Sequence, residues 1–299
     1  MIQRGKSDQS LFGPSRQLVA WVAAVLGAGV TPKAARSLHG GESPWWIDLE
    51  TPGGQAVAVV LRSPSSRISA QAVATNAAAL EIAARYGIPV PRLLAADLDG
   101  DEAGVPATLE SAVREAAGWP VPVTADLLRA AGAAIALVHT IPLEPRPDLP
   151  FRSRPIAVDD FAADRRLGRI PTTELLSGAD ERLRSLPIPS GPTVFVHGDV
   201  WPGNVLVAGD AVDALIDWKT AGAGRPGIDL GELRKQVSIR YDDEAPRYVL
   251  EGWERAAGTR ARDVAYWDAI AALNTHTDAD GPVVAAARDA FLRDALHRL

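Results

Sequence analysis

The chain has 299 residues, 47% of them hydrophobic, which is enough for a sizeable core in one or two lobes. Its formal charge of −6, with 31 basic and 37 acidic residues spread along the chain, argues against nucleic acid as a partner. The absence of cysteine excludes disulfides, thiolate metal sites and cysteine nucleophiles, and it fits a cytoplasmic protein. The longest apolar stretch, 18–30, is shorter than the ~20 residues of a membrane helix, and residues 1–10 lack a signal-peptide layout. We therefore expect a cytoplasmic protein that binds no membrane.

The first third of the chain predicts a small antiparallel sheet accompanied by two helices. Apolar spacing over 15–27 indicates an amphipathic helix, and the alanine-rich stretch 68–86 indicates a second helix that ends at Gly87. Alternating apolar runs and turn residues predict four strands, at 46–50, 56–62, 92–96 and 105–111.

Helices dominate the remainder of the chain. Helical periodicity predicts six helices, at 124–140, 172–185, 228–239, 243–257, 261–274 and 283–297, and places His139 at the end of the first as a core or capping residue. Strands first and helices later indicate an α+β fold with a nucleotide-binding lobe over 1–111 and a helical catalytic lobe over 112–299.

Two short strands carry the most informative residues of the chain. Asp199 and Asn204 precede the apolar run 205–207, with a tight turn at 202–203 between them. A second apolar run, 212–216, ends at Asp217, and the Gly-Asp at 209–210 is a hairpin signal. We therefore expect the three polar side chains to converge at one end of this hairpin.

Phosphoryl transfer needs positioned groups and charge neutralisation more than covalent chemistry. Asp199 is suited to accept the proton of a hydroxyl, and the oxygens of Asn204 and Asp217 are suited to ligate Mg²⁺ bound to a nucleoside triphosphate. The alternative, that these are ordinary turn residues, is accepted for Asp210 and Asp213. The fixed order of the whole set is too specific for that explanation.

The pattern His-Gly-Asp-x-x-x-x-Asn, followed by Ile-Asp-Trp with its Asp thirteen residues after the Asn, resembles the aminoglycoside phosphotransferase and choline kinase family. The resemblance extends to the connector 87–94, the long helix at 128–142 and the Asp-Leu-Gly segment within 225–231. It implies a bilobal protein-kinase-like fold and transfer of the γ-phosphoryl group of ATP or GTP, with Mg²⁺, to a hydroxyl of a small metabolite or antibiotic. The implied enzyme is a monomer or homodimer. The negative net charge of the chain is compatible with a cationic acceptor.

The resemblance also implies roles for individual residues. Asp199 is the catalytic residue, His197 supports its loop, and Asp229 braces that loop, although capping of the following helix is an alternative for Asp229. The turn at 38–43 resembles the one that covers the nucleotide, so Gly40, Gly41 and Ser43 are candidate nucleotide contacts.

Two positions depart from the family pattern. Arg62 occupies the strand position of the phosphate-binding lysine, and Asn76 occupies the helix position of its glutamate partner. Asn76 cannot form an ion pair, and Glu81 lies about 140° further round the helix. These changes motivate one alternative, a nucleotide-binding pseudokinase with a regulatory role. A second alternative, a housekeeping kinase of an amino alcohol or sugar instead of a resistance enzyme, stays open because the sequence does not select the acceptor.

The acceptor is expected within 143–190 and after Gly231. The acidic run 242–244 is a candidate site for an ammonium group, although such a run is more often a solvated face or a helix N-terminus.

Overall fold

A computed structural model describes residues 13–113, 119–278 and 281–299. These residues form two compact units. The first contains the described residues up to Leu80 and those from Pro91 to Val113, and the second contains Glu81–Val90 and the described residues from Trp119 onward. Residues 81–90, which the predicted division at 111/112 assigns to the N-terminal lobe, thus group with the second unit. The first ten residues, where no signal peptide is expected, lie outside the described part of the chain.

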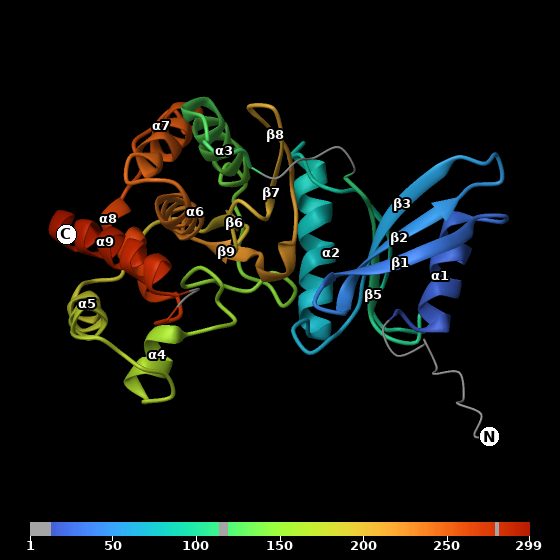
Figure 1. The fold of residues 1–299 in the computed structure, drawn as a ribbon, viewed down its shortest axis with the longest axis horizontal. Helices are drawn as coiled ribbons and strands as arrows, with labels where there is room; N and C mark the ends of the chain where they lie inside the picture. The colour runs from blue at the N-terminus through green and yellow to red at the C-terminus, as the bar shows by residue number, and fades with distance from the viewer. Residues whose placement is uncertain (1–12, 114–118, 279–280) are drawn as a thin grey trace, which may run out of the picture. The chain divides into compact units, whose positions relative to one another are not determined.

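The first unit contains a five-stranded antiparallel sheet (Figure 1). Its strands are β1 (Thr31–His39), β2 (Glu42–Glu50), β3 (Ala56–Arg62), β4 (Leu93–Asp97) and β5 (Ala107–Ser111), in the order β1-β2-β3-β5-β4. Alternate residues of β2 are buried, as expected for a strand with one face on a core. Helix α1 (Arg16–Leu26) packs its buried Leu18, Trp21 and Val22 into that core. The four predicted strands and the helix are confirmed.

Strand β1 is an addition to the strands predicted from apolar alternation. Most of its residues are exposed, so it lacks the period-2 apolar pattern by which a half-buried strand is recognised. Gly40 and Gly41 join β1 to β2 with φ angles of 63° and 91°. Two consecutive positive φ angles are typical of a two-residue hairpin turn, which explains the pair of glycines.

The second unit is mainly helical. The six predicted helices are confirmed as α3 (Ala125–Val138), α5 (Glu174–Ser185), α6 (Gly227–Arg240), α7 (Ala245–Ala257), α8 (Val264–Leu273) and α9 (Pro282–Arg298). Two small sheets pair β6 (Val194–Val196) with β9 (Gly222–Gly224) and β7 (Val205–Ala208) with β8 (Ala211–Leu215). Helix α4 (Phe161–Arg166), β6 and β9 are too short to give a periodic signal in the sequence. Helix α2 (Ala70–Arg85) spans the boundary between the units.

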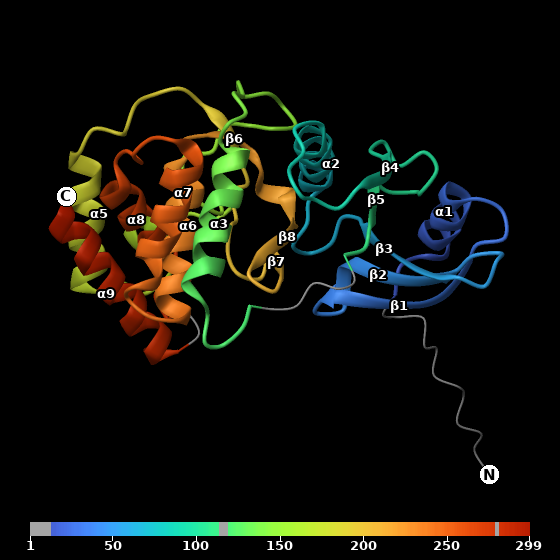
Figure 2. The same cartoon turned by 90° about the horizontal axis from the view of Figure 1, so that it is seen from above.

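Helices α3 and α7 lie side by side in Figures 1 and 2 although they are far apart in the sequence. Two glycines allow this close approach. A Cβ atom on Gly132 would lie 2.0 Å from the carbonyl oxygen of Val249, and one on Gly252 would lie 2.0 Å from that of Arg129. The contact places His139, which caps α3, against Trp253 of α7.

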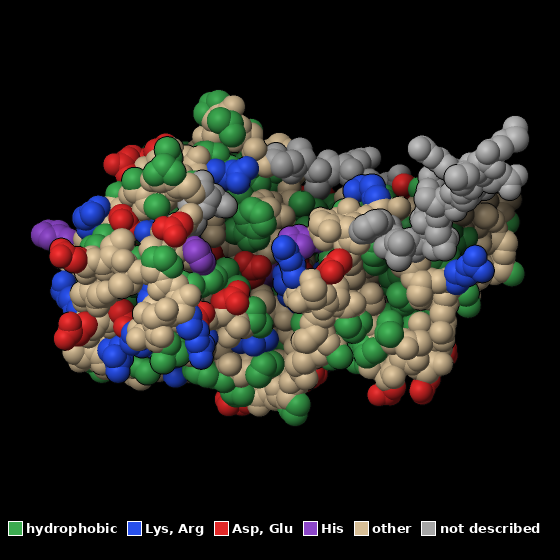
Figure 3. Space-filling model, turned by 60° about the horizontal axis from the view of Figure 1, so that its bottom comes forward, with side chains coloured by type: hydrophobic (Ala, Val, Ile, Leu, Met, Phe, Trp, Pro, Cys, Tyr) green, Lys and Arg blue, Asp and Glu red, His purple; other side chains and the backbone are tan. Residues whose placement is uncertain are grey.

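The observed architecture confirms the predicted α+β class, with the antiparallel sheet first and the helices after it. None of the described helices is long and apolar enough to cross a membrane. On the face in Figure 3, acidic and basic side chains are interspersed over the larger unit.

Candidate active site

The β7–β8 hairpin of the second unit brings the predicted metal ligands together. Val205 pairs with Leu215, and the N–H of Ile216 donates to the carbonyl oxygen of Asn204 at 2.9 Å. Asn204 and Asp217 therefore flank the same end of the hairpin. The side-chain amide nitrogen of Asn204 donates to the backbone oxygen of Asp199 at 2.8 Å, so the predicted convergence of all three residues is observed.

The backbone of this loop depends on a glycine and on an unusual aspartate conformation. Gly198 has φ 82°, and a Cβ atom there would lie 2.3 Å from the carbonyl oxygen of Thr220. The glycine of His-Gly-Asp is therefore required by close backbone approach. Asp217 has φ 64°, a left-handed conformation that costs a non-glycine residue on the order of 1–3 kcal/mol and is concentrated at functional sites.

Asp229 holds the start of the loop. Its two carboxylate oxygens accept the N–H groups of His197 and Gly198, each at 2.8 Å, and one of them contacts His139 Nε2 at 3.1 Å. The indole N–H of Trp253 donates to His139 Nδ1 at 2.9 Å, which assigns the remaining ring proton to Nε2. Burial alone would raise the pKa of Asp229, but the hydrogen bonds from His139 and the backbone outweigh it and keep the pKa below its ordinary value.

This geometry distinguishes between the two roles considered for Asp229. The residue lies inside α6, whose N-cap is Pro226, and its carboxylate oxygens are hydrogen-bonded to the loop. Asp229 therefore braces the loop, and the local sequence gave no sign that His139 and Trp253 orient it.

His197 is buried, and both of its ring nitrogens have backbone partners. Nδ1 accepts the N–H of Asp199 at 3.3 Å, and Nε2 donates to the carbonyl oxygen of Ile216 at 2.9 Å. Its ring lies 4.3 Å from that of Trp218, centroid to centroid. Burial lowers the pKa of His197, although Asp229 opposes that effect. A neutral histidine with both nitrogens engaged supports the loop and is not available as a general base.

Asp199 lies in a cluster of charged groups. Burial raises its pKa to about 7, Lys219 opposes the rise, and Glu232 and Asp217 reinforce it. The ammonium group of Lys219 donates to Asp217 Oδ2 and lies 3.9 Å from Asp199 Oδ2. Lys219 was not recognised from the sequence, where it is one of many scattered basic residues.

The donor atoms of this site suit a hard divalent cation. The amide oxygen of Asn204 and the carboxylate of Asp217 are the ligand types that Mg²⁺ prefers. Among the described residues, no group of three or more His, Cys, Asp or Glu side chains could hold a metal by itself. Two protein oxygens fit Mg²⁺, which would take its other ligands from water and phosphate.

Arg62 of the first unit has a carboxylate partner that the sequence did not reveal. Its Nε lies 3.4 Å from Oε1 of Glu110 on β5, and the amide nitrogen of Asn76 donates to the same oxygen at 2.8 Å. The side chains of Arg62 and Glu110 are only 4% and 5% exposed, so this is a buried ion pair. The carboxylate thus comes from the neighbouring strand instead of from α2, where Glu81 is exposed.

The other candidate nucleotide contacts also belong to the first unit. Gly40 and Gly41 form the β1–β2 turn, as expected from the resemblance. Ser43 is buried at the start of β2, where its hydroxyl oxygen accepts the N–H of Ser63 at 2.8 Å. This bond gives Ser43 a structural role in the sheet, and its contact with nucleotide stays a prediction.

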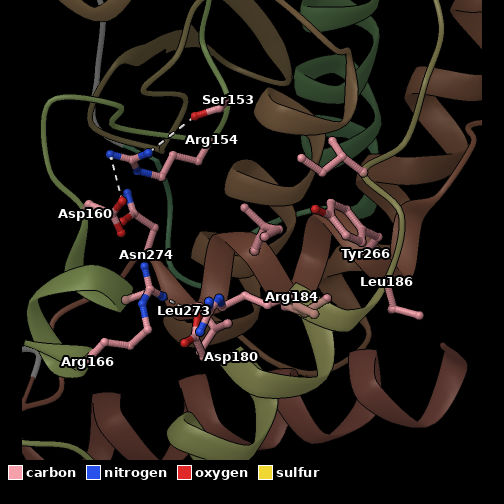
Figure 4. Close-up of a pocket in the computed structure, with 14 residues that line it drawn as sticks. Ser153, Arg154, Asp160, Arg166, Asp180, Arg184, Leu186, Tyr266, Leu273 and Asn274 are labelled. Carbon is pink, nitrogen blue, oxygen red and sulfur yellow. Dashed lines mark hydrogen bonds and ion pairs between the residues drawn. The ribbon is translucent and has the colours of Figure 1, made fainter.

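A cavity of about 320 Å³ lies in the second unit, between the chain at 153–160, helices α4 and α5, and helix α8 (Figure 4). Its lining combines ion pairs with apolar and aromatic groups. Arg154 lies 3.4 Å from Asp160, and Arg166 lies 2.7 Å from Asp180. The N–H of Ile156, close to this lining, donates to the carbonyl oxygen of Gly198 at 2.7 Å and so ties the segment to the loop that carries Asp199.

The acidic run at 242–244 serves the N-terminus of α7. A carboxylate oxygen of Asp242 accepts the N–H groups of Glu244 and Ala245, at 3.0 and 2.8 Å, and Glu244 pairs with Arg247 at 2.8 Å. The structure thus favours the helix-terminus interpretation over an ammonium site.

Comparison with known proteins agrees with this architecture. The sequence model of the phosphotransferase enzyme family (APH) matches residues 34–290, whereas no curated protein matches the chain. A Ralstonia eutropha JMP134 protein assigned as an aminoglycoside phosphotransferase is 16% identical, with a TM-score of 0.66, over 94% of this chain and 98% of that one.

Two further solved structures are similar. The macrolide 2′-phosphotransferase MphH of Brachybacterium faecium is 17% identical, with a TM-score of 0.60, over 94% of this chain and 97% of that one. Amicoumacin kinase hAmiN, in complex with AMP-PNP, Ca²⁺ and its ligand Ami, is 12% identical, with a TM-score of 0.59, over 95% and 93%. These solved structures share the fold of the chain. Because the family model matches most of its length, the chain belongs to the phosphotransferase enzyme family.

Proposed function

We propose that this enzyme transfers the γ-phosphoryl group of ATP, bound with Mg²⁺, to a hydroxyl of a small metabolite or antibiotic. The observation that carries the proposal is the convergence of Asp199, Asn204 and Asp217 at one end of the β7–β8 hairpin. The AMP-PNP held by the amicoumacin kinase favours an adenine nucleotide, with GTP as the alternative donor.

Asp199 is the proposed catalytic residue. Its carboxylate would orient the acceptor hydroxyl and take its proton as the oxygen attacks the γ-phosphorus and the bond to the leaving ADP breaks. A pKa of about 7 matches proton transfer near neutral pH. Asn204 and Asp217 would hold Mg²⁺, which supplies charge neutralisation on the phosphates when bound. His197 and Asp229 keep the loop in place through the hydrogen bonds described above.

Arg62 remains our candidate for the phosphate contact in the first unit, with Gly40, Gly41 and Ser43 as candidate contacts in or beside the nucleotide-covering turn. A guanidinium group can bind phosphate oxygens bidentately. The ion pair with Glu110 supports this role because it supplies the orienting carboxylate that Asn76 cannot. It also weakens the case for a pseudokinase, which rested on the missing pair.

The acceptor is proposed to be a small hydroxylated molecule that binds to the second unit. The cavity in Figure 4 combines residues from both segments expected to bind it, 143–190 and the part after Gly231. Its lining contains two arginine–aspartate pairs, a further arginine (Arg184) and an aromatic side chain (Tyr266), and so it is not an acidic site of the kind that binds a polycation. The identity of the acceptor decides between a resistance enzyme and a housekeeping kinase.

A phosphorylation screen tests the proposal directly. The purified enzyme is offered ATP or GTP with Mg²⁺ and panels of hydroxylated amines, macrolides and sugars, and phosphorylated product is detected by mass spectrometry. On the acceptor found, Asp199→Ala should lower kcat by about a hundredfold or more, while the nucleotide Kd hardly changes. Near-normal turnover by this variant would contradict the role of Asp199.

A further inference from the structure

Lys219 lies at the centre of the candidate metal site. It follows Asp217 by two residues, in the short 3₁₀ turn Trp218–Thr220. Its Nζ donates to Asp217 Oδ2 and lies 3.9 Å from Asp199 Oδ2. One ammonium group is therefore shared by the proposed catalytic carboxylate and a proposed metal ligand.

The other ammonium group that acts on Asp199 has its own partner. Lys235 on α6 donates to both carboxylate oxygens of Glu232, at 2.8 and 2.9 Å, and to the hydroxyl of Thr275 at 3.0 Å. Its charge is thus matched by a buried carboxylate on the same helix. Lys219, in contrast, is 24% exposed and is held by the acids of the site itself.

A divalent cation and this ammonium group cannot share Asp217 without strong repulsion. Asp217 Oδ2 is bonded to Lys219, and the carboxylate of Asp217 is also the charged ligand expected for Mg²⁺. Two cations within a few ångströms repel each other strongly in a partly buried site, where solvent screens them less than in water.

We propose that Lys219 is the resident cation of this site: it neutralises Asp217 before nucleotide binds, and it must leave Asp217 when a divalent cation arrives. The proposal rests on the proposed function, because it takes Asp217 as a metal ligand. Free Mg²⁺ then binds weakly, because it has to displace the ammonium group. A metal that arrives with a nucleotide also brings phosphates, which can receive the displaced ammonium group. Lys219 thereby makes the enzyme select the metal–nucleotide complex over the free metal.

Mn²⁺ alone is a suitable probe, measured by calorimetry or by electron paramagnetic resonance without nucleotide. Lys219→Met leaves an unbranched side chain only one atom shorter and removes its charge, so this variant should bind Mn²⁺ about tenfold more tightly than the wild type. Lys219→Arg keeps the charge and should bind Mn²⁺ like the wild type. Lys33→Met is a control for net charge, because Lys33 pairs with Glu50 on the surface of the first unit. It should leave the Mn²⁺ affinity unchanged.

Unchanged or weaker Mn²⁺ binding by Lys219→Met would overturn the proposal. If that variant does not fold, Lys219→Gln provides the same comparison, and circular dichroism verifies the fold of each protein. Asp217→Asn separates this inference from the proposed function. If Mn²⁺ binding is lost in Asp217→Asn but is insensitive to Lys219, only the role of Lys219 fails. If Mn²⁺ binding does not depend on Asp217, the metal site on which both proposals rest is wrong.

Discussion

Asn76→Glu is a sharp test of how the first unit orients its arginine. By comparison with the family pattern, this substitution would restore the missing glutamate on the helix and strengthen the site. The structure predicts the opposite. Glu110 already lies against Arg62, and Asn76 donates an amide hydrogen to the same carboxylate at 2.8 Å. A glutamate at position 76 would replace that donor with a second carboxylate.

The expected cost follows from burial. Asn76 is fully buried, and the side chains of Arg62 and Glu110 are at most 5% exposed. Loss of a hydrogen bond to a charged group costs about 1.5–3 kcal/mol, and a second buried carboxylate must either repel the first or take up a proton. We therefore expect Asn76→Glu to lower the free energy of unfolding by about 3 kcal/mol or more.

Urea unfolding followed by circular dichroism measures the change, with two matched variants. Asn76→Gln has the size of the glutamate without its charge, so the difference between these two variants isolates the charge. The double variant Asn76→Glu/Glu110→Gln moves the carboxylate from β5 to α2 and should recover most of the loss, because one acid again faces Arg62. Wild-type stability in Asn76→Glu, or a double variant less stable than the single one, would refute the reasoning.

Three further predictions concern the second unit. Asp217→Ala should weaken Mg²⁺–nucleotide binding, measured by calorimetry, more than Asn204→Ala does, because Asp217 carries the charge. The metal site would be contradicted if the wild type bound nucleotide equally well without metal and neither substitution changed that binding. Burial raises the pKa of Asp199 from 3.8 to about 7. Between these two pH values the metal-free folded protein holds a proton on Asp199 that the unfolded chain releases. The free energy of unfolding therefore falls as the pH rises from about 4 to about 7. Asp199→Asn should therefore have a free energy of unfolding about 2–4 kcal/mol higher than that of the wild type at pH 8, and close to that of the wild type at pH 4. Equal stability of the two proteins at both pH values would contradict the raised pKa of Asp199. Asp229→Asn should cost about 3 kcal/mol of unfolding free energy and lower kcat, because buried N–H groups lose a charged acceptor; a cost below about 1 kcal/mol would show that the brace is dispensable.

The sequence by itself determined the local features of this protein. Helices α3 and α5 begin where it indicates, because Thr124 and Thr173 each accept one of the free N–H groups in the first turn of the helix that follows. The β7–β8 hairpin follows from two apolar runs around a Gly-Asp turn, and it brings Asn204 and Asp217 together because they flank its ends. These are short-range effects that the chain encodes within a few residues.

Only the tertiary structure decided which distant side chains form hydrogen bonds and ion pairs with the residues of those local elements. Glu110 is 48 residues from Arg62 and meets it through the register of β3 against β5. His139 meets Asp229 of α6 across 90 residues, and Trp253 of α7, which orients the ring of His139, is 114 residues from it. A hydrophobic period shows which face of an element is buried, but not which distant element covers it. The partner of a buried polar group is fixed only when the elements pack, since that group must then find its hydrogen bond among whatever side chains the packing provides.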